Sequence, residues 1–64
     1  MIQLSPRQSE ILGLVVQGQA NKMIARQLMV SEKTVKNQLT IMYRKLNVQS
    51  RTQAAIWALR QNPG

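Results

Sequence analysis

The sequence predicts an all-α fold, a four-helix bundle that contains a helix-turn-helix. Helix-start and helix-stop signals alternate along the 64 residues, and no segment shows the alternation of apolar and polar residues that marks a half-buried strand. The connections between the expected helices are about two to four residues long, as is usual in small helical bundles. We therefore expect one domain over residues 1–64.

The first helix is expected from about Pro6 to Gln17. Ser5 can cap its start, proline suits the first helical position, and Gln8 completes a capping box three residues after the serine. Apolar residues then recur at helical spacing as far as Gly18. Glycine readily adopts the left-handed conformation that ends a helix.

A second, shorter helix is expected from about Asn21 to Leu28, and its start carries the weakest signal. Ala20 has no side-chain oxygen with which to cap the helix, so we expect Asn21 to cap it or the end to fray. The short connection after Leu28 leads to Ser31, a good N-cap for the next helix.

The third helix is expected over about residues 32–46. A narrow apolar stripe runs along it at spacings of four, three and four residues, through Val35, Leu39, Met42 and Leu46. Asn47 can adopt the left-handed conformation that ends this helix. The short turn between the second and third helices suits a helix-turn-helix.

The fourth helix is expected to run to about Gln61 and to be stopped by Asn-Pro-Gly at 62–64. Ser50 and Gln53 repeat the capping-box pattern at its start. One arc of the helix carries Ala54, Ala55, Ala58 and Leu59, and Ile56 and Trp57 flank the opposite side. A helix that is apolar on two sides buries two surfaces. Trp57 therefore either seals the small core or joins Ile56 in a two-fold dimer contact.

The charge of the chain is strongly one-sided. Nine Lys and Arg against two Glu give a formal net charge of +7, which indicates a polyanionic partner. His, Cys and Asp are absent, so the chain lacks the ligands of zinc sites, the oxygen clusters of calcium or magnesium sites and the usual nucleophile–base pairs. We expect no cofactor, no metal and no enzymatic activity.

The polar side of the third helix has the composition of a surface that reads DNA. At about 100° per residue, the opposite side from Val35 carries three cations, two short polar side chains and no carboxylate: Lys33, Lys36, Asn37, Thr40 and Arg44. Lys can reach O6 and N7 of guanine, Asn can pair with adenine, and a Thr methyl can pack on the thymine methyl. A solvated surface is the ordinary alternative, but it would carry acidic residues as well. The pattern predicts entry into the major groove.

Three other classes of function fit less well. A cationic membrane binder is usually one long amphipathic helix, whereas caps and stops divide this chain into short helices. RNA-binding surfaces stack bases on aromatic rings, of which the chain has two. If the chain were a helical adaptor that binds only proteins, it would show no salt-dependent binding to duplex DNA. The short apolar runs and the absence of Cys favour a cytoplasmic protein that does not bind membranes.

Four segments resemble the LuxR-type helix-turn-helix domain in order and spacing. They are SPRQSEIL at 5–12, NKMIA at 21–25, LMVSEKTVKN at 28–37 and RKLNVQSR at 44–51. The domain is the effector domain of NarL/FixJ response regulators and of quorum-sensing regulators. The resemblance implies a winged-helix-like core of three helices plus a fourth helix, which binds duplex DNA as a homodimer and controls transcription, with RNA polymerase as a further partner.

The resemblance also implies roles for single residues. Base contacts are expected from Lys36, Asn37 and Thr40. Phosphate contacts are expected from Lys22, Ser31, Lys33, Thr34, Arg44 and Lys45, and dimer contacts from Ile56 and Trp57. The sequence contains no sensor and no phosphoacceptor Asp, so the chain is either the effector domain of a larger two-component regulator or a stand-alone module.

The chain departs from the family pattern at four positions. Ala20 and Met23 stand where the family usually has a capping Ser and a Glu, so the second helix loses its capping box. Gln38 stands where the family often has His. Gln8 replaces a common Glu.

Two further residues have structural interpretations. We expect an internal ion pair between Glu10 and one of Arg44, Lys45 or Arg51. We expect the ring of Tyr43 to pack at the edge of the core with its hydroxyl exposed, and a hydrogen bond to phosphate is the alternative.

Overall fold

The computed structural model describes residues 3–61, and these form four α-helices and no strand. The helices are α1 (Pro6–Val16), α2 (Asn21–Leu28), α3 (Glu32–Leu46) and α4 (Arg51–Gln61). Every predicted helix is present, and the all-α prediction is confirmed. The expected stop at 62–64 lies outside the described residues.

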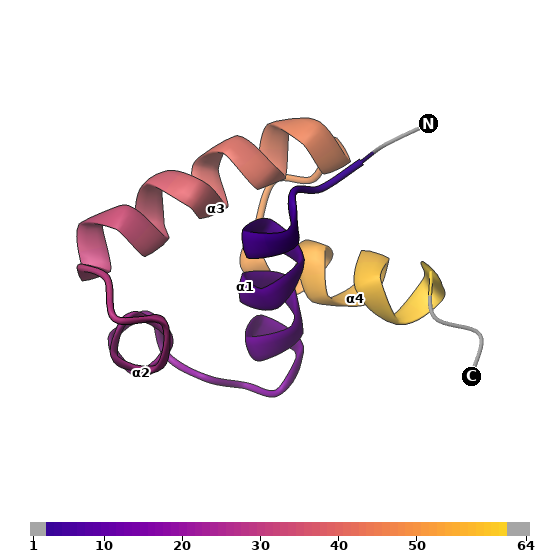
Figure 1. Ribbon diagram of the computed structural model, residues 1–64. Helices are drawn as coiled ribbons and strands as arrows, with labels where there is room; N and C mark the ends of the chain where they lie inside the picture. The colour runs from indigo at the N-terminus through magenta and orange to yellow at the C-terminus, as the bar shows by residue number, and fades with distance from the viewer. Residues whose placement is uncertain (1–2, 62–64) are drawn as a thin grey trace.

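The long helix α3 lies across the other helices (Figure 1). α1 stands below α3 in this view and packs against both α3 and α4, whereas α2, seen end-on, packs mainly against α3. The pair α2 and α3, joined by a short turn, forms the helix-turn-helix. Because α1 and α4 support α3 from one side, the other side of α3 faces outward.

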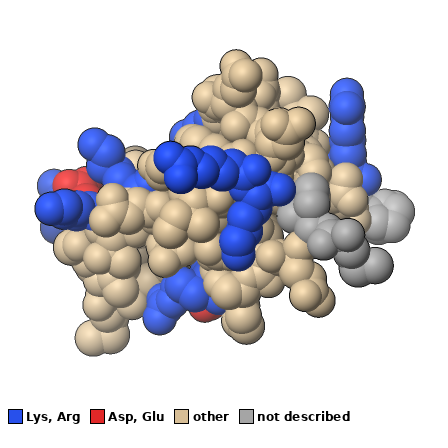
Figure 2. Space-filling view, turned by 90° about the horizontal axis from the view of Figure 1, so that it is seen from above, with Lys and Arg blue, Asp and Glu red and all other residues tan. Residues whose placement is uncertain are grey.

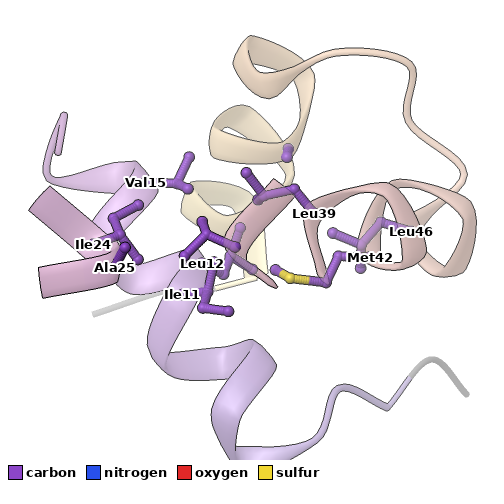
Figure 3. Close-up of a cluster of buried hydrophobic side chains, with 10 residues drawn as sticks. Ile11, Leu12, Val15, Ile24, Ala25, Leu39, Met42 and Leu46 are labelled. Atoms are coloured by element: carbon purple, nitrogen blue, oxygen red, sulfur yellow. The ribbon is translucent and has the colours of Figure 1, made fainter. Parts of the chain in front are cut away.

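One apolar core joins all four helices (Figure 3). Its buried members are Ile11, Leu12, Val15, Ile24, Ala25, Val35, Leu39, Met42, Leu46 and Ala54. All four residues of the predicted stripe on α3 are among them, so that prediction is confirmed. Burying this stripe fixes the rotation of α3 about its axis, and therefore decides which side chains remain outside.

The capping signals of α1 and α3 are confirmed. The amide of Gln8 donates to Ser5 Oγ at 3.1 Å and the amide of Ser5 donates to Gln8 Oε1 at 3.0 Å, which completes the capping box. Ser31 Oγ accepts from the amide of Thr34 at 3.0 Å at the start of α3. Asn47 ends α3 in the left-handed conformation, with φ of 55°.

The capping of α4 differs slightly from the predicted box. The amide of Gln53 donates to Ser50 Oγ at 3.1 Å, as expected. The side chain of Gln53, however, accepts from the amide of Gln49 at 2.7 Å instead of from that of Ser50. The long glutamine side chain therefore reaches one residue further back than a capping box requires.

The start of α2 contradicts the prediction that Asn21 is its cap. Ala20 is the N-cap, and Asn21 is already the first helical residue. Its side-chain oxygen is turned toward α4, where it accepts a hydrogen bond from Nη1 of Arg51 at 2.6 Å. Nη2 of Arg51 donates to the carbonyl oxygen of Gln19. A residue 30 positions away therefore holds a helix end for which the local sequence offers no cap.

The end of α2 is formed by a residue that rarely does so. Met29 adopts the left-handed conformation, with φ of 58° and ψ of 44°. The amide of Val30 donates to the carbonyl oxygen of Ala25 at 2.9 Å, which closes the turn as in a Schellman motif. Glycine or asparagine usually occupies this position.

Candidate nucleic-acid interface

The outward side of α3 carries the residues predicted to read bases. Lys33, Lys36, Asn37, Thr40 and Arg44 are all exposed. Figure 2 looks down on this side of the molecule, where Lys and Arg spread over the surface and Glu appears only in small areas toward the edges. The arrangement therefore offers an acid-poor, cationic ridge, and such a ridge attracts a polyanion.

The orientation of Thr40 limits what it can offer a base. Its hydroxyl donates to the carbonyl oxygen of Lys36, one turn earlier, at 3.1 Å. The hydroxyl proton is therefore used within the helix, and the side chain presents its methyl group and oxygen lone pairs to the outside. This favours apolar contact with a thymine methyl over donation to a base acceptor.

The first turn of α3 combines hydroxyl groups with helix amides. Ser31 Oγ and Thr34 Oγ1 lie 2.9 Å apart and share a hydrogen bond. The amides of Glu32 and Lys33 precede the first bond within the helix, so they have no partner along it. Both hydroxyl-bearing residues and Lys33 are exposed. Amides and hydroxyls at a helix start are common phosphate ligands in protein–DNA complexes.

The structure separates the two cations at the end of α3. Arg44 lies on the same side as Lys33 and Asn37 and is exposed. Nζ of Lys45 instead donates to Oε1 of Gln8 in α1, at 3.1 Å. Lys45 therefore lies on the flank of α3 that faces α1, where a single ammonium group can still serve both α1 and a phosphate through its remaining donors.

A buried polar cluster joins α1 to α3, and sequence reasoning missed it. Gln8 is only 5% exposed, and besides its two capping bonds and its bond from Lys45 it donates from Nε2 to Oε1 of Gln38 at 3.1 Å. Gln38 lies only about 60° around the helix from Val35. A polar residue so near an apolar stripe must find a hydrogen-bond partner at the edge of the core. The position of Gln38 beside the stripe was therefore the sequence signal for this cluster.

The predicted internal ion pair of Glu10 is wrong. Glu10 is exposed to solvent. Lys45 and Arg51, two of its three expected partners, donate instead to Gln8, Asn21 and Gln19. Tyr43 is half-buried against the core, as expected for a packed ring.

α4 presents apolar side chains to the outside. Trp57 packs against the core and is half-buried, whereas Ile56 is 45% exposed and Leu59 is 62% exposed. On the arc that carries the alanines, Ala54 is buried and Ala55 and Ala58 pack against the core, whereas Leu59 lies outside it. Within residues 3–61, no helix is long and apolar enough to cross a membrane.

The chain resembles bacterial transcription regulators in both sequence and structure. A family model described as bacterial regulatory proteins, luxR family, matches residues 2–58. The nitrate/nitrite response regulator protein NarL of Escherichia coli is 49% identical over 55 residues, which are 86% of this chain and 26% of NarL. The transcriptional regulatory protein LiaR of Bacillus subtilis is 44% identical over 59 residues, 92% of this chain and 28% of LiaR.

Two solved structures share the fold. The DNA-binding domain of the response regulator ComA, crystallised with the anti-activator RapF, superposes with a TM-score of 0.86 at 41% identity, over 88% of this chain and 97% of that one. The transcription factor GerE gives a TM-score of 0.84 at 41% identity, over 91% of this chain and 87% of that one. The chain spans about a quarter of the length of curated relatives such as NarL.

Proposed function

Since this chain belongs to the LuxR family of bacterial regulatory proteins, a family of DNA-binding transcription regulators and not of enzymes, we propose that it recognises duplex DNA by placing α3 in the major groove. The observation that carries the proposal is the exposed, acid-poor side of α3 opposite a fully buried stripe. The same rotation of α3 that fills the core turns its base-reading residues outward.

Base recognition is assigned to the middle of this side. Lys36 supplies a donor for guanine, Asn37 supplies a donor and an acceptor that match adenine, and Thr40 supplies a methyl group for thymine. All three are exposed, and they lie within about 100° of one another around the helix. They can therefore contact neighbouring base edges from one docking pose.

Phosphate binding is assigned to the residues around this centre: Lys22, Ser31, Lys33, Thr34, Arg44 and Lys45. Their exposure supports the assignment, and Lys45 takes part from the flank that also contacts Gln8. If about five phosphates are neutralised, the logarithm of the binding constant falls with the logarithm of salt concentration with a slope near −4 to −5.

We further propose that two copies bind DNA together through Ile56 and Trp57 of α4. The exposed Ile56 beside the half-buried Trp57 supports a contact that each copy makes with the same patch of the other. A two-fold dimer would read two half-sites about one helical turn apart. The similarity to the response regulator NarL and the transcriptional regulatory protein LiaR supports a role as the effector domain of a response regulator. We propose that this regulator acts in the cytoplasm and together with RNA polymerase.

Selection of bound duplexes from fragmented genomic DNA, at physiological salt, tests the proposal. The chain is expected to enrich a short palindromic site and to bind it about a thousandfold more tightly than a scrambled duplex. Equal affinity for selected and scrambled duplexes would contradict base recognition. Binding that does not change with salt, or binding only to anionic vesicles, would favour an adaptor or a membrane protein instead.

A further inference from the structure

The first turn of α2 depends on a side chain from another helix. Ala20 stands at the N-cap with φ of −73° and ψ of 156°, the extended conformation typical of an N-cap, but its methyl group cannot accept a hydrogen bond. Met23, at the third helical position, cannot complete a capping box either. α2 has only eight residues, and a helix this short has little stability of its own.

Arg51, the first residue of α4, supplies the missing constraint. Its Nη1 donates to Asn21 Oδ1 at 2.6 Å, and its Nη2 donates to the carbonyl oxygen of Gln19. The two acceptors lie on either side of the N-cap, Ala20. The planar guanidinium presents its donors in a rigid fork, so it holds the backbone of Gln19 and the side chain of Asn21, on either side of the cap, at once. Arg51 is half-buried, which limits its freedom to leave this position.

The same segment carries one of the proposed phosphate contacts. Lys22 follows Asn21 directly, and the amides of both residues precede the first hydrogen bond along the helix. The carbonyl oxygen of Ala20 accepts from the amides of Met23 and Ile24, both at 2.9 Å. Any movement of residues 19–21 therefore moves the first turn of α2 and the Lys22 stem with it.

We propose that Arg51 is a positioning residue for DNA binding, which anchors the start of α2 where no side chain caps it and so holds Lys22 in register with α3. The inference rests on the proposed function. Two donors of Arg51 are directed to protein acceptors at the start of α2, so the proposed action runs through α2 and not through contact with DNA. A direct phosphate contact by Arg51 is the competing interpretation, and the two differ in whether a new cap can replace the arginine.

The experiment measures affinity for a selected and a scrambled duplex, at a temperature where circular dichroism shows each variant folded. Arg51→Ala is expected to weaken both affinities about tenfold, and Arg60→Ala, which removes an exposed arginine from the same helix, less than about twofold. Ala20→Thr in the Arg51→Ala background is expected to recover most of the lost affinity, since threonine can cap α2. Ala20→Val, of the same shape without the hydroxyl, is expected to recover none.

Asn21→Ala is the decisive variant if Arg51→Ala fails to fold. It removes one acceptor of the arginine and keeps every positive charge, so a weakening of about threefold for both duplexes supports the positioning role. Hydrogen exchange of the Ile24 amide is expected to accelerate in Asn21→Ala and to slow again when Ala20→Thr is added. A structural role spread over the whole fold would instead accelerate exchange in α1 and α3 equally.

Two results overturn the inference. The first is an Asn21→Ala variant with unchanged affinity. The second is an Arg51→Ala variant whose lost affinity for DNA is not recovered by Ala20→Thr. In that case the slope of log binding constant against log salt concentration also falls in magnitude by about 0.9, as for one lost phosphate contact. If the unsubstituted chain shows no salt-dependent binding to duplex DNA, the proposed function fails, and this outcome is distinct from a failure of the Arg51 inference alone.

Discussion

Replacing Met29 with glycine should stabilise the protein, although it removes a large apolar side chain. Met29 closes α2 in the left-handed conformation, with φ of 58° and ψ of 44°. Its side chain is 90% exposed, so its removal leaves no cavity and little apolar contact is lost. The substitution therefore isolates the backbone strain of one residue.

The expected gain follows from two opposing effects. A residue with a Cβ pays about 1–2 kcal/mol to adopt the left-handed conformation, and glycine avoids this penalty. Glycine also has more conformational freedom in the unfolded chain, which reduces the gain by about 0.5–1 kcal/mol. A net stabilisation of about 0.5–1 kcal/mol remains, which corresponds to a rise in Tm of about 2–8 °C for a domain of this size.

Thermal unfolding followed by circular dichroism measures the change, with Met29→Ala as the matched control. Alanine removes the same exposed side chain but keeps the Cβ, so its Tm should stay close to that of the unsubstituted chain. Affinity for the selected duplex should be the same for all three proteins. A Tm for Met29→Gly at or below that of Met29→Ala would refute the reasoning, because it would show that the turn is not strained.

Three further predictions concern the interface, the dimer and the buried polar cluster. Lys36→Ala should reduce the preference for the selected over the scrambled duplex by about 1–3 kcal/mol, whereas Lys22→Ala should weaken binding to both duplexes alike. Competition binding measures both effects. Equal losses of affinity for the two duplexes in Lys36→Ala would contradict its role in base recognition. Ile56→Glu should leave the fold and half-site binding intact and lower affinity for the full palindrome. If the unsubstituted chain sediments as a monomer on the full site, the dimer is contradicted. Gln8→Glu should raise Tm at low salt and less at high salt, because the new carboxylate pairs with Lys45 and the Gln38 amide can turn to donate to it in place of the lost bond from Gln8 Nε2. An equal rise at both salt concentrations would show that charge pairing is not the cause.

The helices and the outward side of α3 followed from local patterns. The stripe through Val35 and Leu39 predicted which side of α3 is buried, and the structure confirms it. The caps at Ser5 and Ser31 likewise marked helix starts that the structure contains. These predictions succeed because periodicity and capping depend on residues within about four positions of one another.

The failures that concern polar partners of distant helices share one cause. The sequence suggested Asn21 as a cap and Glu10 as an ion-pair partner, but Asn21 accepts from Arg51 and Glu10 is exposed. Gln8 was expected only to cap α1, yet it also contacts Gln38 of α3. For Asn21 and Gln8 the partner lies 30 positions away along the chain, and for Glu10 the expected partners lay at least as far away and bond elsewhere or remain exposed.

Amino-acid order alone decided where the helices begin and end, which stripe of α3 is buried and which cations remain on its opposite side. These features depend on short-range geometry and on the removal of apolar area from water. Only the packing of the four helices decided that Arg51 holds the start of α2 and that Lys45 turns toward α1. Long polar side chains have many rotamers of similar energy, so their partners are chosen only when distant helices bring a donor and an acceptor within reach.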